Sequence, residues 1–260
     1  MNRNNEVLHI SRPEAHVAVV TLQRPQARNA INGEVALALE QAVADTEADD
    51  AVRVVILTGS GSVFCAGADL KAVSSGRGHE LWRPESGFAG FVDVRRQKPW
   101  IAALNGAALA GGCELMLACD LVVAVAHASI GLPEVSRSLI AAAGGLMRLP
   151  RALPRNLAIE LALTADPMDA RRAHELGLIN HLAAEGELMD STLQLARRVA
   201  RNAPIAVRES LALIKQALDQ PESTLHGLTM AARERISQTE DYQEGPRAFV
   251  EKRAPQWQGR

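Results

Sequence analysis

The stretch Leu104–Asp120 limits the possible folds of this chain more than any other. An apolar run, Trp100–Leu104, leads into it, and Asn105-Gly106 interrupts the run. Small residues follow up to Gly111-Gly112, and a helical pattern begins at Cys113. This order predicts a strand, a tight turn and a helix N-terminus. Unpaired backbone N–H groups and the helix dipole favour negative charge at such an end.

Glu114 lies three residues after Gly111, about one helical turn, so the Gly111 N–H and the Glu114 carboxylate can face the same space. The two glycines would let a ligand approach the main chain. A donor beside a carboxylate suits a reaction in which a carbonyl gains negative charge while a proton moves. A purely structural interpretation stays open, because acids often only complement a helix dipole and Gly-Gly is often only a turn. The catalytic interpretation requires a second donor and a second acid.

Two other segments offer these groups. In Val63–Lys71 a strand again passes through small residues into a helical pattern, and the N–H of Ala68 is the candidate second donor. A buried strand is expected at Leu121–Ala126, and a following strand stops at Pro133. Glu134 comes directly after it and is the candidate second acid.

Composition excludes several classes of function. The 260 residues are 47% hydrophobic with a net charge of −2, which does not indicate a general affinity for nucleic acid or for an anionic membrane. No stretch approaches the roughly eighteen apolar residues of a membrane helix. Met1–Glu6 is polar and lacks the apolar core of a signal peptide. We therefore expect a cytoplasmic protein with no membrane partner.

The three cysteines, Cys65, Cys113 and Cys119, form an odd set without metal-ligand spacing. Reduced thiols in the cytoplasm fit this pattern, and no metal site is expected. A nucleophilic role for Cys113 beside Glu114 is an open alternative, weakened because no histidine lies nearby in the sequence.

The rest of the chain indicates a strand-rich part followed by a helical part. Strands are expected at Val17–Leu22 and Val52–Leu57, with a helix from Asn32, which can cap it, and a solvated acidic segment at Asp45–Asp50. Ser74–Gly90 is expected to be a mobile loop and short helix near a pocket, or an ordinary surface excursion.

Helical patterns dominate from Asn156 onward. The break at Asn202-Ala203-Pro204 predicts a domain boundary near residue 200. The helices after it are amphipathic, so they must pack on the first domain or on another subunit.

Together these segments resemble the crotonase, or enoyl-CoA hydratase/isomerase, superfamily over nearly the whole chain. The motifs that carry the resemblance are Arg24-Pro25 with Asn29-Ala30, Phe64–Leu70, Asn105-Gly106 through Gly111–Leu115 to Asp120, Leu132–Glu134, Gly144-Gly145 with Arg148–Pro150, Ala173 to Gly177–Asn180, and Glu244–Trp257.

The resemblance implies an α/β fold, a crotonase-like spiral of β-β-α units in residues 1–200, followed by a helical C-terminal trimerisation region in residues 201–260. It implies a homo-trimer or a dimer of trimers. The substrate would be an acyl thioester of coenzyme A, with no separate cofactor and no metal.

The resemblance also assigns site residues. The thioester oxygen would lie in an oxyanion hole formed by the N–H groups of Ala68 and Gly111. The coenzyme would be bound by residues of one segment and of the tail, namely Ala66, Ala68, Asp69, Leu70, Lys71, Phe249 and Lys252. The two tail residues resemble positions that reach the coenzyme of a neighbouring subunit.

Glu114 and Glu134 match the two glutamates of the hydratases. In that chemistry ionised Glu114 takes a proton from water as the water adds to Cβ, and Glu134 delivers a proton to Cα. The expected function is thus enoyl-CoA hydratase, a hydro-lyase. The alternatives are an enoyl-CoA isomerase, a carnitinyl-CoA-type dehydratase and, outside enzymes, an RNA-binding module, against which the charge argues.

Three departures from the hydratase pattern concern the acyl pocket. Ala110 stands where many hydratases have a third glycine, Ala141–Gly145 replaces a Pro-Gly-Ala-Gly-Gly run, and Ser138 replaces a glycine. The tail and the segment Gly87–Gly90 look most like carnitinyl-CoA dehydratase-like members. The acyl group itself is not predicted.

Overall fold

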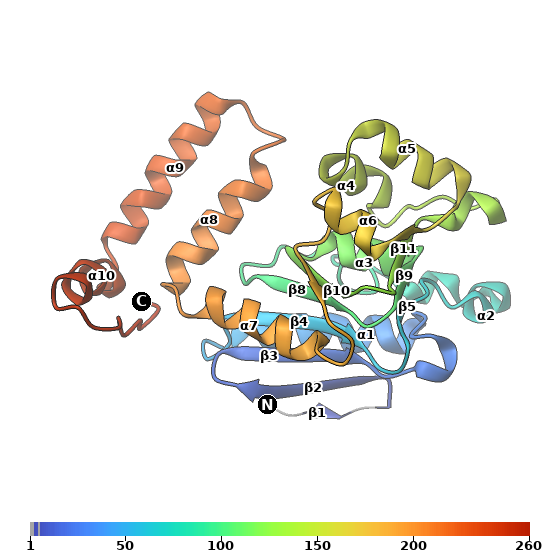
Figure 1. Ribbon diagram of the computed structural model, residues 1–260, viewed down its shortest axis with the longest axis horizontal. Helices are drawn as coiled ribbons and strands as arrows, with labels where there is room; N and C mark the ends of the chain where they lie inside the picture. The colour runs from blue at the N-terminus through green and yellow to red at the C-terminus, as the bar shows by residue number, and fades with distance from the viewer. Residues whose placement is uncertain (1–2, 5) are drawn as a thin grey trace.

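The computed structural model describes residues 3–4 and 6–260 (Figure 1). Its main sheet has the strand order β1-β2-β3-β4-β8-β10-β13. The strands are β1 (Arg3–Asn4), β2 (Leu8–Glu14), β3 (Val17–Leu22), β4 (Val54–Gly59), β8 (Trp100–Leu104), β10 (Leu121–Val125) and β13 (His181–Ala183). The first three pair antiparallel and the others parallel. Continuous apolar strands such as β4 and β8 are buried throughout, as expected for a sheet covered on both faces.

A second, smaller sheet has the order β12-β11-β9-β5. Its strands are β12 (Met168–Asp169), β11 (Ser129–Gly131), β9 (Ala107–Leu109) and β5 (Val63–Cys65). The chain repeatedly passes from a strand of the main sheet to one of this sheet and then into a helical segment. β8, β9 and α3 (Gly111–Ala118) form one such turn, so the predicted spiral of β-β-α units is confirmed.

Helices cover the sheets and extend beyond them (Figure 1). They are α1 (Gly33–Ala48), α2 (Leu70–Ala72), α4 (Gly145–Ala152), α5 (Arg155–Thr164), α6 (Ala170–Glu175), α7 (Leu188–Ala200), α8 (Pro204–Gln216), α9 (Glu222–Ser237) and α10 (Glu240–Val250). Shorter helical turns are η1 (Pro25–Ala27), η2 (Val73–Arg77), η3 (Gly78–Leu81) and η4 (Pro133–Arg137). α7 packs against β3, β4, β8 and β10 of the main sheet.

Several sequence predictions are confirmed. β3 has the predicted bounds, and the Asn32 side chain caps α1 by accepting from the Val35 N–H at 3.0 Å. In Ser74–Gly90 the expected short helix is present as η2 and η3, whereas the rest forms a hairpin of β6 (Trp82–Arg83) and β7 (Gly87–Phe88) that was not predicted.

Other predictions are wrong in detail. α3 begins at Gly111, two residues earlier than predicted, because glycine can start the helix before the apolar pattern is visible. The acidic segment Asp45–Asp50 is mostly half-buried or exposed, but it is also the last turn of α1, and buried Lys98 donates to its Thr46 and Asp49 carbonyls at 2.7 and 2.8 Å. Both β12 and β13 were missed, because strands of two or three residues carry no periodicity.

The last three helices project away from the sheets (Figure 1). α8 and α9 pack on each other, and α7 ends where the predicted break begins. The tail then returns: the Trp257 Nε1–H donates to the Arg201 carbonyl at 2.8 Å. Within residues 3–4 and 6–260, no helix combines the length and the apolar character needed to span a membrane.

Candidate active site

The two predicted donor loops lie side by side. A Cβ placed on Gly67 would lie 2.8 Å from the Gly111 nitrogen and 2.8 Å from the Ala110 Cβ. Ala68 forms a bridge with Ile31, in which the Ile31 N–H donates to the Gly67 carbonyl and the Asp69 N–H to the Ile31 carbonyl. In this pattern the Ala68 N–H has no partner among the described residues. The Gly111 N–H, in the first turn of α3, has none there either.

The two glycines at the start of α3 have different roles. A Cβ on Gly112 would collide with the Cys65 carbonyl of β5, so this glycine serves helix–strand packing and not ligand approach, which corrects the sequence interpretation. A Cβ on Gly111 would lie 2.5 Å from the Phe88 ring. Phe88 packs edge-on against Trp82 with ring centroids 5.5 Å apart. The hairpin of β6 and β7 therefore lies against the donor loop.

Glu114 lies on the inner face of α3, 3% exposed. Its Oε1 accepts a hydrogen bond of 2.8 Å from the Gly145 N–H at the start of α4. Burial, with a smaller effect from the charge of Glu134, raises the pKa of this carboxyl to about 7, although the Gly145 N–H and Arg148 act in the opposite direction. The Glu114 carboxyl can therefore gain or lose a proton near neutrality.

Glu134 enters the same space from η4, just after β11. It is 8% exposed, and its Oε2 is buried without a hydrogen-bond partner among the described residues. Burial raises the pKa of this carboxyl as well. Two acids near each other, one with an unsatisfied oxygen, form a site that can hold and move a proton.

Cys113 is buried near both acids, and burial together with their charges raises the pKa of its thiol. Because only a thiolate is a strong nucleophile, the nucleophilic alternative loses support. No cluster of three or more His, Cys, Asp and Glu side chains that could hold a metal ion occurs in the described part of the chain.

The predicted coenzyme segment has a rigid base and an exposed edge. The Asp69 carboxylate accepts from the Lys71 N–H at 3.0 Å and pairs with Arg24 at 2.9 Å, so it anchors the start of α2. Leu70 is 50% exposed and Lys71 is exposed, whereas Ala66 is half-buried. Leu70 and Lys71 are thus accessible to a ligand, and Asp69 acts on the backbone.

The predicted tail residues lie elsewhere. Phe249 is 85% exposed at the end of α10, and Lys252 follows it. α10 and α2 occupy opposite ends of the long axis of the molecule (Figure 1). One chain therefore does not bring Phe249 and Lys252 to the segment Ala66–Lys71.

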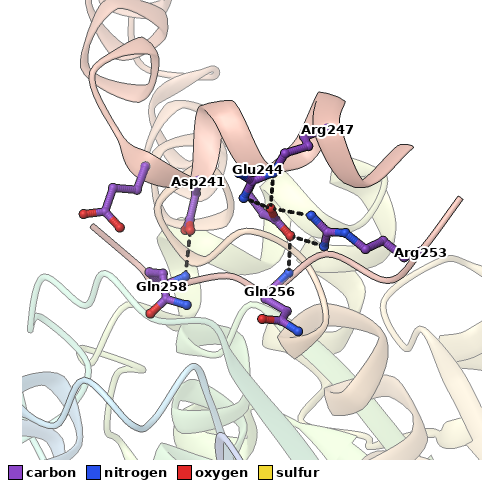
Figure 2. A pocket seen from close by; sticks show the side chains of 7 residues that line it. Asp241, Glu244, Arg247, Arg253, Gln256 and Gln258 are labelled. Atoms are coloured by element: carbon purple, nitrogen blue, oxygen red, sulfur yellow. Dashed lines mark hydrogen bonds and ion pairs between the residues drawn. The ribbon is translucent and has the colours of Figure 1, made fainter. Parts of the chain in front are cut away.

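A second acidic cluster lies in a hollow beside α10 (Figure 2). Here Glu244 accepts from Arg247, Arg253 and the Gln256 N–H at 2.5 to 2.8 Å. These partners hold the pKa of the Glu244 carboxyl well below its usual range. A carboxylate paired in this way fastens the tail, and it lacks the raised pKa that Glu114 and Glu134 have.

The comparisons with known proteins agree with this geometry. The family model described as enoyl-CoA hydratase/isomerase matches residues 12–260. The chain belongs to this family. The family members include a solved enoyl-CoA hydratase of Mycobacterium tuberculosis H37Rv, which is 39% identical with a TM-score of 0.94, over 98% of this chain and 100% of that chain.

Other family members carry a different name. A solved carnitinyl-CoA hydratase of Mycobacterium avium is 44% identical with a TM-score of 0.78, over 99% of this chain and 100% of that one. A carnitinyl-CoA dehydratase of Salmonella typhi is 36% identical over 262 residues, covering 98% of this chain and all of the relative. The crotonase resemblance and the α/β crotonase fold are thus confirmed, and the relatives support a hydro-lyase of the enoyl-CoA hydratase type.

Sequence reasoning missed two residues that shape the site in this family member. Gly145 supplies the N–H that holds Glu114, and Phe88 packs against Gly111. The Gly144-Gly145 pair was a visible signal, but nothing in the sequence shows which carboxylate its N–H faces. Phe88 lies 23 positions before Gly111, too far for a local pattern to link the two.

Proposed function

We propose that this protein is an enoyl-CoA hydratase, which adds water reversibly across the 2,3 double bond of a 2-enoyl-CoA thioester. The observation that carries the proposal is the pair of buried glutamates with raised pKa values beside two unpaired N–H groups. Glu114, when ionised, takes a proton from water as the oxygen bonds to Cβ. The electron pair of the double bond moves to Cα and into the thioester carbonyl.

The Ala68 and Gly111 N–H groups stabilise the oxygen of this enolate-like species, where negative charge develops. Glu134 then delivers a proton to Cα, so that the sum of the two steps adds H and OH. Because one acid loses and the other gains a proton, the pair must exchange a net proton before the next turnover. Burial raises the pKa of both carboxyls, which favours the protonated form that one of them must take in this exchange.

The same acids could run related reactions. An isomerase needs one glutamate to shuttle a proton between Cα and Cγ, and a carnitinyl-CoA-type dehydratase runs the elimination on a substrate with a cationic group. The presence of two buried acids favours hydration or its reverse over isomerisation, and the relatives carry both kinds of name, hydratase and dehydratase.

We further propose that residues 1–200 bind the acyl-CoA and residues 201–260 serve oligomerisation. The motive is the exposed apolar surface of α8 and the turn after it, where Ile214 is 69% and Leu218 is 71% exposed. In a trimer, Phe249 and Lys252 of one subunit would contact the coenzyme bound at Ala66–Lys71 of the next. The expected cytoplasmic location stays a prediction and agrees with the three free cysteines.

The deciding experiment is a panel of 2-enoyl-CoA, 3-enoyl-CoA and 3-hydroxyacyl-CoA thioesters, a carnitine-like one among them, scored by the change in conjugated absorbance and by product analysis. A hydratase gives the 3-hydroxyacyl-CoA from the 2-enoyl substrate. Formation of the 2-enoyl from the 3-enoyl thioester, without hydration, would assign the isomerase instead. Dehydration confined to a carnitine-like thioester would assign the dehydratase.

The glutamates are tested on the best substrate of that panel. Glu114→Gln and Glu134→Gln should each lower the hydration rate by about 10²–10⁴-fold, the usual loss for a general acid or base. Glu175→Gln, at an exposed glutamate of α6, is the matched control. Near-native turnover in either active-site variant would show that its glutamate has been given the wrong role.

A further inference from the structure

Arg148, on α4, joins two loops that meet at the proposed site. Its Nη1 donates to the Ala143 carbonyl at 3.0 Å, and its Nη2 donates to the Val92 carbonyl at 2.6 Å. Nη2 also lies 3.7 Å from the Asp93 carboxylate. The side chain is only 28% exposed. One half-buried guanidinium therefore binds two separate segments of the chain.

The first segment holds Glu114. The Gly145 N–H donates to the Glu114 carboxylate, and the Ala143 backbone also stabilises its charged form. The Arg148 guanidinium lies where a Cβ on Gly144 would stand, so it closes directly on this loop. By fixing the Ala143 carbonyl, it fixes the direction in which the loop presents its N–H groups.

The second segment carries the aromatic wall of the donor loop. The Val92 N–H donates to the Phe88 carbonyl at 3.3 Å, and the Asp93 N–H to the Ser86 carbonyl at 3.1 Å. The Phe88 ring in turn lies against Gly111. The same guanidinium thus connects the loop that holds the acid to the turn that supports the oxyanion donor.

We propose that Arg148 is a positioning residue, which clamps the Ala143–Gly145 loop to the Phe88–Asp93 turn and so holds Glu114 in register with the Gly111 N–H. The proposal rests on the hydratase function given above. It assigns Arg148 no contact with substrate. Its effect on the reaction passes through the orientation and the charge of Glu114.

The charge has a direction that can be tested. The titratable groups that face Glu114 are Glu134 from η4, Cys113 from α3 and Arg148 from α4. Cys65 lies on β5, which packs against α3, and β9 contributes no titratable group. Burial and the charge of Glu134 raise the pKa of the Glu114 carboxyl, and the positive charge of Arg148 lowers it. Loss of this cation should therefore raise that pKa.

The experiment compares Arg148→Gln, which removes the charge, with Arg148→Lys, which keeps the charge and loses the forked pair of donors. Arg151→Gln is the matched control, because Arg151 lies on the same helix and pairs with Asp219 on the surface. Hydration of the best 2-enoyl-CoA is measured from pH 5 to pH 9. The Glu114 carboxyl is titrated separately, by infrared difference spectra against Glu114→Gln.

Arg148→Gln should lower kcat by up to about 10²-fold, as misplacement of a reacting group does, and move the acidic limb of the pH–rate profile upward. Arg148→Lys should lower kcat while leaving the acidic limb near its wild-type position. Arg151→Gln should change neither. An unchanged kcat or an unchanged acidic limb in Arg148→Gln, with the fold intact by circular dichroism, overturns the proposal.

The infrared titration separates this proposal from the proposed function. If wild-type protein hydrates no 2-enoyl-CoA, the function fails, but the Glu114 titration still reports on Arg148. A higher midpoint in Arg148→Gln than in wild type supports the clamp, and an equal midpoint contradicts it.

Discussion

At the scale of the residue, the burial of Glu114 in the proposed site should make the fold less stable at neutral and higher pH. Its pKa rises from 4.5 to about 7 on folding, so the native state binds this proton more tightly than the unfolded chain. Its stabilising contribution is present below the unfolded pKa and is lost as the pH rises through the folded one. From pH 5 to pH 8, the free energy of unfolding of the wild-type protein should therefore fall by about 1–3 kcal/mol relative to that of Glu114→Gln.

Thermal unfolding of both proteins at pH 5 and pH 8 measures this difference. As the pH increases, the Tm of Glu114→Gln should rise relative to the Tm of the wild-type protein. A gap that does not change with pH would show that the carboxyl is not held in an unfavourable environment.

A second test at this scale concerns the two proposed oxyanion donors, the backbone N–H groups of Ala68 and Gly111. Ala68 would act only through its backbone, so Ala68→Pro, which deletes the N–H, should be severe, whereas Ala68→Gly should be mild. Gly111→Val should lose activity and substrate binding together, because its side chain would meet the Phe88 ring and displace a donor worth about 3–4 kcal/mol. The rate of hydration and the affinity for an unreactive acyl-CoA are the measurements. A folded and fully active Ala68→Pro would move the oxyanion site elsewhere.

At the scale of the element, the start of α3 is strained. Ala110, its N-cap, has φ 51° and ψ −128°, a conformation that glycine adopts easily and alanine does not. The glycine that many hydratases carry here is thus explained by backbone geometry. The third departure, Ser138, has the same explanation, because at φ 54° at the end of η4 it occupies the left-handed region that glycine adopts easily.

Ala110→Gly should relieve this strain and stabilise the protein by about 1 kcal/mol, the low end of the cost of such conformations. Ala38→Gly, within the regular helix α1, is the control and should destabilise by a similar amount. Chemical denaturation midpoints report both changes. If Ala110→Gly lowers the midpoint as Ala38→Gly does, the N-cap is not strained.

At the scale of the whole molecule, the C-terminal helices expose apolar side chains that a single chain does not cover. Light scattering at micromolar concentration should give three or six times the chain mass of 27.9 kDa. The double variant Ile214→Glu/Leu218→Glu should shift the mass toward the monomer, because two buried charges oppose association. Leu37→Glu, at a 56% exposed leucine on α1, is the control. A wild-type monomer would contradict the proposed trimer.

The sequence by itself indicated the strand at Trp100–Leu104 and the turn from it into the helix α3, and it singled out Glu114 and Glu134 as the candidate acids. These depend on local features: apolar runs long enough to show a strand, glycine at a turn, and an acid one helical turn after a donor. The crotonase resemblance extended them to the fold, which the family match confirms. The roles of the site residues and the boundary near residue 200 remain proposals.

Only the tertiary structure decided which groups meet. Gly67 lies beside Gly111 because β5 and β9 pair in one sheet, and Phe88 reaches the same place from a hairpin. The tertiary structure also gives the acids of the chain different surroundings. Glu244 is saturated by arginines, whereas Glu114 and Glu134 are buried with few partners. The physical reason is that a pKa depends on burial and on charges brought close by folding, and residue order carries neither.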